Sequence, residues 1–170
     1  GVVYIGRLSQ EKGVEWLVNT WKETFPDVPM KIVGDGPDLA RLHELTEGTN
    51  IKLVGHVSRE ECFEILASSK ALIMPSICFE TFGRTVIEAY SSGTPVLVPQ
   101  GGALEELVTE PYMGGTFESG NTESFRQQVG YLLKDTAEGR DERLRSLYKN
   151  EYSVDSVYRQ TMKIYKEVLL

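Results

Sequence analysis

The chain has 170 residues, of which 41% are hydrophobic and 25% charged, and its 18 basic against 25 acidic side chains leave a net charge of −7. This composition is typical of one globular domain whose core needs neither disulfides nor a structural metal, and it excludes a disordered chain. The acidic total also argues against a nucleic-acid-binding surface, so no nucleic acid is expected as a partner.

The sequence also bears on the location of the protein and on the state of its cysteines. No apolar run approaches the roughly 20 residues of a membrane span and the first residues do not form a signal peptide, so the cytoplasm is the expected location. The chain opens on an apolar run without a methionine, as expected for a piece excised from a longer protein. Cys62 and Cys78 are isolated and are expected to be reduced core residues, not a disulfide or zinc set.

Short apolar runs rich in β-branched residues alternate with segments of helical periodicity. The runs at 2–5, 30–33, 51–54, 71–74 and 95–98 are predicted strands, 114–117 is a weaker sixth, and 122–170 is predicted to form two or three amphipathic helices. Alternating strands and helices imply a parallel sheet covered on both faces. The fold class predicted is therefore a doubly wound, Rossmann-like α/β sheet of about six strands, with the ligand beyond the carboxyl ends of the strands.

The loop after the first strand carries two cations at this ligand edge. Gly6 permits close backbone approach, and Arg7 and Lys12, five positions apart, can converge on one anion. The alternative is a solvated turn with surface charges. The segment is not a P-loop, because no Gly-Lys-Ser/Thr ending is present.

The loop after the second strand contains a Gly-x-Gly turn. Gly34 and Gly36 precede Pro37, which suits the first position of a helix. Leu39 stands where a third glycine of the dinucleotide fingerprint would fall. We therefore interpret the segment as a turn at the ligand edge, beside a nucleobase, and not as an NAD site.

The stretch from 75 to 90 runs from a strand through a glycine turn into a helix. A helix start offers free amides and a partial positive charge of about one half, so it can hold an anion. Glu80 lies in the loop and Glu88 lies inside the helix. Instead of binding a ligand, Glu80 could be a solvated acid in the loop, and Glu88 could form a structural ion pair with Arg84 that contributes about 0.3–0.5 kcal/mol. The Gly101-Gly102 turn could supply a second set of backbone donors, or it could be a plain connection.

In order and spacing these motifs resemble the group 1 retaining glycosyltransferases of the GT-B fold. The similarity runs from the start of the chain to about Phe117, and it implies that residues 1–170 are the C-terminal, donor-nucleotide-binding domain. The family's N-terminal, acceptor-binding domain has no counterpart in the chain. The motifs that carry the resemblance are Gly6-Arg7-x4-Lys12-Gly13, Gly34-x-Gly36-Pro37, Gly55-x-Val57, Pro75-Ser76, Glu80-x7-Glu88-Ala89, Gly93-x-Pro95-Val96 and Gly101-Gly102-x2-Glu105.

The resemblance implies roles for individual residues. Arg7 and Lys12 would hold the donor diphosphate and Glu80 would bond the hydroxyls of the transferred sugar, and these three are the expected catalytic residues. Glu88 would bond the ribose. The remaining donor-binding residues implied are Gly6, Gly34, Val57 at the base, Phe82, Gly83 and Arg84 through backbone amides, and Thr85 at phosphate. Thr81 and Arg84 depart from the family pattern, so Arg84 could contact phosphate or pair with Glu88.

A nucleoside-diphosphate sugar is accordingly the expected donor, and no further cofactor is expected. The chain has no Asp-x-Asp pair to hold a nucleotide-bound metal, which predicts metal independence. Two alternatives stay open: a sugar-nucleotide 2-epimerase, against which the Glu-x7-Glu spacing argues, and a non-catalytic nucleotide-sugar sensor. The expected partner is the missing N-terminal half, and any peripheral membrane association is expected only through it. Nucleobase, sugar and acceptor are left open.

Overall fold

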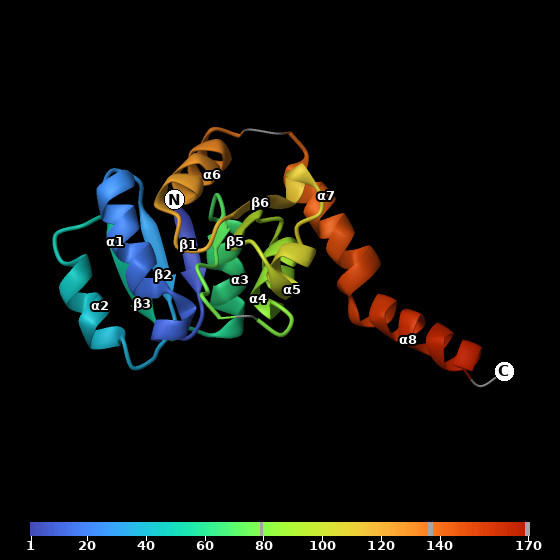
Figure 1. The fold of residues 1–170 in the computed structure, drawn as a ribbon. Coiled ribbons are helices and arrows are strands. Elements are labelled where there is room, and N and C mark those ends of the chain that lie inside the picture. Colours follow the sequence, from blue (N-terminus) through green and yellow to red (C-terminus); the bar gives the residue numbers. More distant parts are fainter. Residues whose placement is uncertain (79, 136–137, 169–170) are drawn as a thin grey trace.

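A computed structural model describes residues 1–78, 80–135 and 138–168. Within these residues, six parallel strands form one sheet in the order β3-β2-β1-β4-β5-β6 (Figure 1). The predicted doubly wound α/β fold is thereby confirmed. The strands are β1 (Val2–Ile5), β2 (Met30–Val33), β3 (Ile51–Gly55), β4 (Leu72–Ile73), β5 (Val96–Pro99) and β6 (Gly114–Phe117).

The strand order reverses between β1 and β4. From β1 the chain moves outward to β2 and β3, then returns to the other side of β1 and moves outward through β4, β5 and β6. The loops that follow β1 and β4 therefore leave the sheet on either side of one crevice. Such a reversal is where doubly wound sheets bind ligands.

Helices cover both faces of the sheet because the strands are apolar on both faces. Val2 and Tyr4 join the core under α1, α2 and α6, whereas Val3 joins the core under α3, α4 and α7. The helices are α1 (Val14–Thr24), α2 (Leu39–Thr46), α3 (Arg59–Ala67), α4 (Arg84–Ser92), α5 (Gly102–Glu106), α6 (Thr122–Lys134), α7 (Arg140–Leu147) and α8 (Val154–Val168). Short turns precede α1 (η1, Gln10–Lys12), β6 (η2, Pro111–Met113) and α8 (η3, Tyr148–Tyr152).

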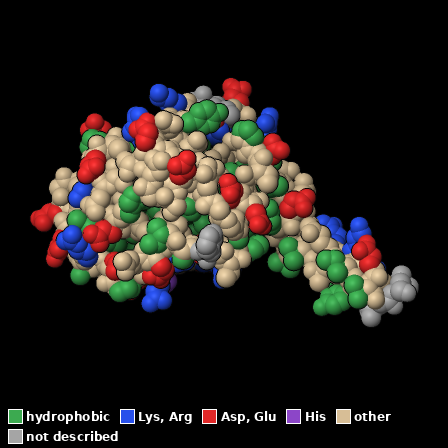
Figure 2. Space-filling view, viewed as in Figure 1, with side chains coloured by type: hydrophobic (Ala, Val, Ile, Leu, Met, Phe, Trp, Pro, Cys, Tyr) green, Lys and Arg blue, Asp and Glu red, His purple; other side chains and the backbone are tan. Residues whose placement is uncertain are grey.

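Helix α8 projects away from the sheet as an arm, at lower right in Figure 1. Apolar side chains gather along this arm (Figure 2), and Val157, Ile164 and Tyr165 are each about half exposed or more. In the part of the chain that the structure describes, no helix has the length and apolar character needed to cross a membrane.

Three expectations need correction. The fourth strand is shorter than 71–74, with only Leu72 and Ile73 in the ladder. Helix α2 begins at Leu39 and not at Pro37. The segment before it is bonded to the loop after β1, since the Leu8 amide donates to the Asp35 carbonyl oxygen and the Asp38 amide donates to the Leu8 carbonyl oxygen. The two cysteines are free but only half-buried: Cys62 packs at the edge of the core under α3 and α4, and Cys78 lies beside Lys12 in the loop after β4.

Candidate functional site

The loop after β1 is held so that its two cations face the crevice. The Tyr4 hydroxyl donates to the Arg7 carbonyl oxygen at 2.7 Å, which fastens the loop to the core. Gly13 ends η1 with φ of +69°, and a Cβ built on it would lie 2.2 Å from the Pro75 carbonyl oxygen. Because only glycine fits there, the loop after β1 packs directly against the loop after β4, and Lys12 reaches across to it.

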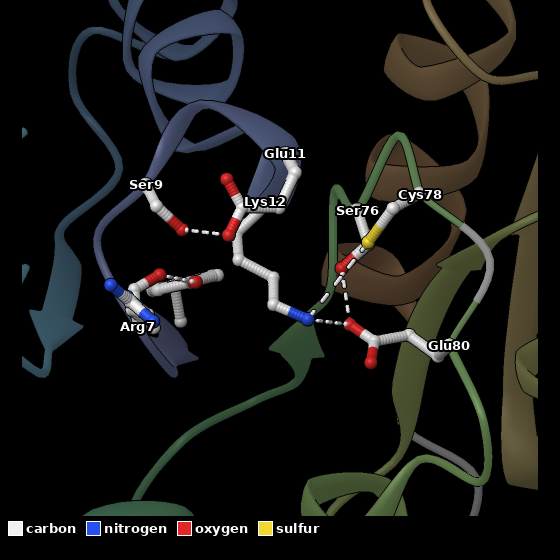
Figure 3. Close-up of polar contacts among 8 residues, drawn as sticks. Arg7, Ser9, Glu11, Lys12, Ser76, Cys78 and Glu80 are labelled. Carbon is white, nitrogen blue, oxygen red and sulfur yellow. Dashed lines mark hydrogen bonds and ion pairs between the residues drawn. The ribbon is translucent and has the colours of Figure 1, made fainter.

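Lys12 meets Glu80 at this junction (Figure 3). Its Nζ lies 2.6 Å from Glu80 Oε1, and the two side chains are only 24% and 18% exposed. Burial lowers the pKa of Lys12, but the hydrogen bond to Glu80 and that carboxylate's charge outweigh burial, so the pKa lies above its ordinary value. Lys12 is therefore a fixed cation at neutral pH. The Ser76 hydroxyl donates to the same Glu80 oxygen at 2.8 Å.

Helix α4 begins at the same pocket. Gly83 precedes it with φ of +89°, and no side chain caps its first turn. The first amides of a helix have no partner within the helix. Gly83, Arg84 and Thr85 line the pocket, so the positive end of α4 is directed toward it and favours an anion there.

Two adjoining pockets open along the carboxyl edge of the sheet. The first, of about 380 Å³, combines the loops after β1 and β4 with the start of α4. The second, of about 300 Å³, combines the loops after β1, β2 and β3 with Cys62 of α3. Ile5, Gly6 and Arg7 line both. The two pockets thus form one groove of the size found for small-molecule sites.

The structure brings most of the predicted site residues together in this groove. Phe82, 52% exposed, stands at the rim of the first pocket. Gly34 and Val57 line the second pocket. A Cβ on Gly34 would lie 1.9 Å from the Gly6 carbonyl oxygen, so these two turns touch through their backbones. The predicted residues in the first pocket are Gly6, Arg7, Lys12, Glu80, Phe82, Gly83, Arg84 and Thr85.

Glu88 lies beside the groove and is not among the residues that line either pocket. Burial and then the negative charge of Glu88 raise the pKa of Cys62, which places the carboxylate near the second pocket. The Arg84 guanidinium is 3.6 Å from Glu88, but Arg84 is 82% exposed. An exposed pair of this kind contributes little, about 0.3–0.5 kcal/mol, and leaves Glu88 available for a ligand.

The Gly101-Gly102 turn does not contribute to either pocket. The Gly101 amide is bonded to the Glu105 carboxylate at 2.8 Å, so this donor is already used locally. Sequence reasoning missed Tyr4, Ser76, Asp35 and His56, which line the two pockets. Ser76 could have been predicted as a site residue, since it belongs to the Pro75-Ser76 motif, but the motif does not indicate which group its hydroxyl bonds.

Comparison with known proteins identifies the family. The model of the family described as "Glycosyl transferases group 1" matches residues 1–135, well over half of the chain. The chain belongs to the group 1 glycosyltransferases. This glycosyltransferase chain is 31% identical over 137 residues to the sulfoquinovosyl transferase SQD2 of Arabidopsis thaliana, a match covering 79% of the chain and 26% of the relative. It is 27% identical over 175 residues to the glycogen synthase of Mycobacterium tuberculosis, a match that covers 96% of the chain and 42% of the relative.

Solved structures share the fold of this glycosyltransferase domain. HepE of Anabaena in complex with UDP superposes with a TM-score of 0.84 at 21% identity, covering 98% of the chain and 48% of HepE. Sucrose-phosphate synthase of Thermosynechococcus elongatus superposes with a TM-score of 0.82 at 22% identity, covering 99% of the chain and 45% of the synthase. The chain thus has a GT-B domain and spans less than half the length of these relatives.

Proposed function

We propose that this domain is the donor-binding half of a retaining, metal-independent glycosyltransferase that uses a nucleoside-diphosphate sugar. The observation that carries the proposal is the convergence of Arg7, Lys12 and the uncapped start of α4 on one pocket at the sheet reversal. Family membership supports the transfer reaction, and the adjoining second pocket offers room for a nucleoside.

The charges in the pocket suit the departure of a nucleoside diphosphate. As the bond between sugar and phosphate breaks, negative charge grows on the phosphate oxygens. Fixed cations and helix amides stabilise that charge more in the transition state than in the ground state. Arg7, Lys12 and the α4 amides would supply this stabilisation, Glu80 would contact the sugar, Glu88 the ribose and Val57 the base. Retention of configuration is inferred from the family resemblance alone.

The acceptor side belongs, in this proposal, to a second half of a longer protein. The chain spans 42% of the glycogen synthase relative and 48% of HepE. Helix α8 carries apolar side chains that the described residues leave exposed. We expect the second half to close over the groove and cover these side chains. The cytoplasmic location stays a prediction.

Calorimetric titration of the 170-residue chain tests donor binding. UDP, GDP and ADP, their glucose or mannose sugars and the free nucleosides are compared, with and without EDTA. Arg7→Ala or Lys12→Ala should weaken diphosphate binding about tenfold to a hundredfold, since each charge-assisted bond contributes about 1.5–3 kcal/mol. Nucleoside binding should not change, and EDTA should have no effect.

Arg41→Ala is the matched control, because Arg41 pairs with Glu15 and Glu44 on the surface of α1 and α2. Glu88→Ala should reduce the preference for ribose over deoxyribose nucleotides. Equal diphosphate affinity in parent, Arg7→Ala and Lys12→Ala would remove the phosphate role, and an EDTA-sensitive affinity would contradict metal independence.

A further inference from the structure

Ser76 occupies a buried position behind the candidate catalytic carboxylate. It lies three residues beyond the end of β4, in the loop that crosses the crevice, and is 3% exposed. Its hydroxyl donates to Glu80 Oε1 at 2.8 Å. Its side chain borders the first pocket but is almost completely buried and already bonded, so little of it is exposed to a ligand there. Its main effect on a ligand therefore passes through Glu80.

Ser76 and Lys12 bond the same oxygen of Glu80. Lys12 Nζ lies 2.6 Å from Oε1, and Figure 3 shows both donors approaching that atom while the second oxygen points away from them. Among residues 1–78, 80–135 and 138–168, none is hydrogen-bonded to Oε2. An ionised carboxylate oxygen is an acceptor with room for more than one donor. The described residues therefore leave Oε2 without a hydrogen bond, and Glu80 lines the first pocket.

We propose that Ser76 is a positioning residue that holds Glu80 with Oε2 directed at a hydroxyl group of the transferred sugar. The proposal rests on the proposed function and deepens it. The recognised chemistry is a neutral, polyhydroxylated group attached to a diphosphate, since an oxygen that only accepts hydrogen bonds selects a hydroxyl donor.

Lys12 and Ser76, which both donate a hydrogen bond to Glu80 Oε1, should behave differently once a nucleotide sugar is bound. The Lys12 ammonium has three hydrogens and is attracted to the incoming diphosphate, so its bond to Glu80 is shared with phosphate. Ser76 cannot follow, because its backbone leaves β4 in the buried core and its hydroxyl lies behind Glu80. Ser76 thus keeps Glu80 in place when Lys12 turns to phosphate. Without Ser76 the carboxylate would move with Lys12, and its aim at the sugar would be lost.

The test separates the sugar from the diphosphate. Calorimetry on the 170-residue chain gives the Kd of UDP and UDP-glucose, and of GDP and GDP-mannose, and the ratio within each pair measures what the sugar contributes. Ser76→Ala should leave the Kd of the diphosphate unchanged and reduce the sugar's contribution about threefold to tenfold, as expected for one hydrogen bond. Ser76→Cys has a side chain of similar size that is only a weak hydrogen-bond donor, so it should give the same change. It replaces the alanine variant in the test if that variant folds poorly.

Ser9→Ala is the matched control. Ser9 is also 3% exposed and its hydroxyl donates to a glutamate, Glu11 Oε1, at 2.7 Å. Glu11 does not line the first pocket, so this variant should leave the ratio unchanged. In a Glu80→Ala background, Ser76→Ala should have no further effect, whereas a merely structural role of Ser76 would cost the same in both backgrounds.

The outcomes distinguish this inference from the proposed function. A parent chain that binds none of these four nucleotides, nor ADP or ADP-glucose, overturns the proposed function and this assignment with it. A parent that binds, combined with an unchanged ratio in Ser76→Ala and Ser76→Cys, overturns the role of Ser76 alone. An equal loss of diphosphate and sugar-nucleotide affinity, or a loss that persists without Glu80, also overturns it.

Discussion

Tyr4 links the core to the groove through a single hydroxyl. Its ring is 1% exposed, and its hydroxyl donates to the Arg7 carbonyl oxygen at 2.7 Å. Burial, followed by the negative charges of Glu80 and Glu11, raises the pKa of Tyr4 well above its ordinary value near 10. The folded chain therefore keeps this proton at pH values where the unfolded chain has lost it.

This difference predicts a loss of stability in alkali. The contribution of Tyr4 is fully present below the pKa of the unfolded chain, about 10, and is lost as the pH rises from there toward the folded pKa. Tyr4→Phe should lower the free energy of unfolding by roughly 1 kcal/mol at pH 7 and should make the decline above pH 10 shallower. Urea unfolding at pH 7 and 10.5 measures both.

Tyr131→Phe is the control for the alkaline experiment, because Tyr131 is 58% exposed. Tyr90 is buried, and burial also raises its pKa, so part of the slope should remain in Tyr4→Phe. An identical slope in the parent and in Tyr4→Phe would show that the Tyr4 phenol does not resist ionisation.

At the same scale, the sequence predicted which loops form the groove better than it predicted the contacts within it. Arg7 and Lys12 follow one strand and Glu80 follows another, so their meeting is a consequence of strand order. Ser76 lies in the same loop, but its bond to Glu80 depends on how that loop turns between them. No residue pattern reports such a turn.

Helix α4 depends on the glycine that precedes it. Gly83 has φ of +89°, and a Cβ there would lie 2.7 Å from Leu104 Cδ2 and 3.0 Å from Leu107 Cδ1. Gly83→Ala should lower the free energy of unfolding by about 1–2 kcal/mol, the cost of a left-handed conformation for a residue with a side chain. It should also weaken diphosphate binding, because the first amides of α4 would shift.

Gly130→Ala provides the opposite expectation in another helix. Gly130 lies inside α6, and a Cβ there would have no neighbour within 4 Å. Alanine should therefore raise the free energy of unfolding by about 0.5–1 kcal/mol. Thermal unfolding and calorimetry of the two variants check both signs, and a Gly83→Ala chain as stable as the parent would show that the start of α4 tolerates a side chain.

At the scale of the elements, the apolar runs predicted where the strands lie, but the sequence did not predict the bounds of β4 or the start of α2. Strand β4 comprises only Leu72 and Ile73, although four residues of that run are buried. The residues on either side are bonded too, since the Val3 amide donates to the Ala71 carbonyl oxygen and the Met74 amide donates to the Leu97 carbonyl oxygen. The segment before α2 is bonded to Leu8, whose amide donates to the Asp35 carbonyl oxygen and whose carbonyl oxygen accepts from the Asp38 amide. These bonds join parts of the chain that are 27 or more positions apart, and local propensity carries no information about them.

On the scale of the whole molecule, α8 forms an arm whose apolar side chains are exposed, unlike those of the sheet. Ile164 is 60% exposed, whereas Ile32 in β2 is fully buried. Ile32→Ala should cost about 2–5 kcal/mol of unfolding free energy, and Ile164→Ala should change it by less than about 0.5 kcal/mol. Denaturant unfolding of both variants compares one chemical change at two sites.

If α8 covers a second half, the same Ile164→Ala change should become destabilising in the longer protein. A large loss in the 170-residue chain would show instead that α8 folds back on its own domain. Turnover by this chain alone should be near zero, because the reacting groups of the acceptor would not be held against the donor.

The reversal of strand order also bears on how the groove comes into being. Lys12 and Glu80 stand 68 positions apart in the chain and meet only because β1 and β4 lie next to each other. A polypeptide that lacks either strand cannot bring these two side chains together and so cannot complete the first pocket. Occupancy of that pocket therefore depends on the intact centre of the sheet, and any ligand that fits should protect distant parts of the sheet from unfolding.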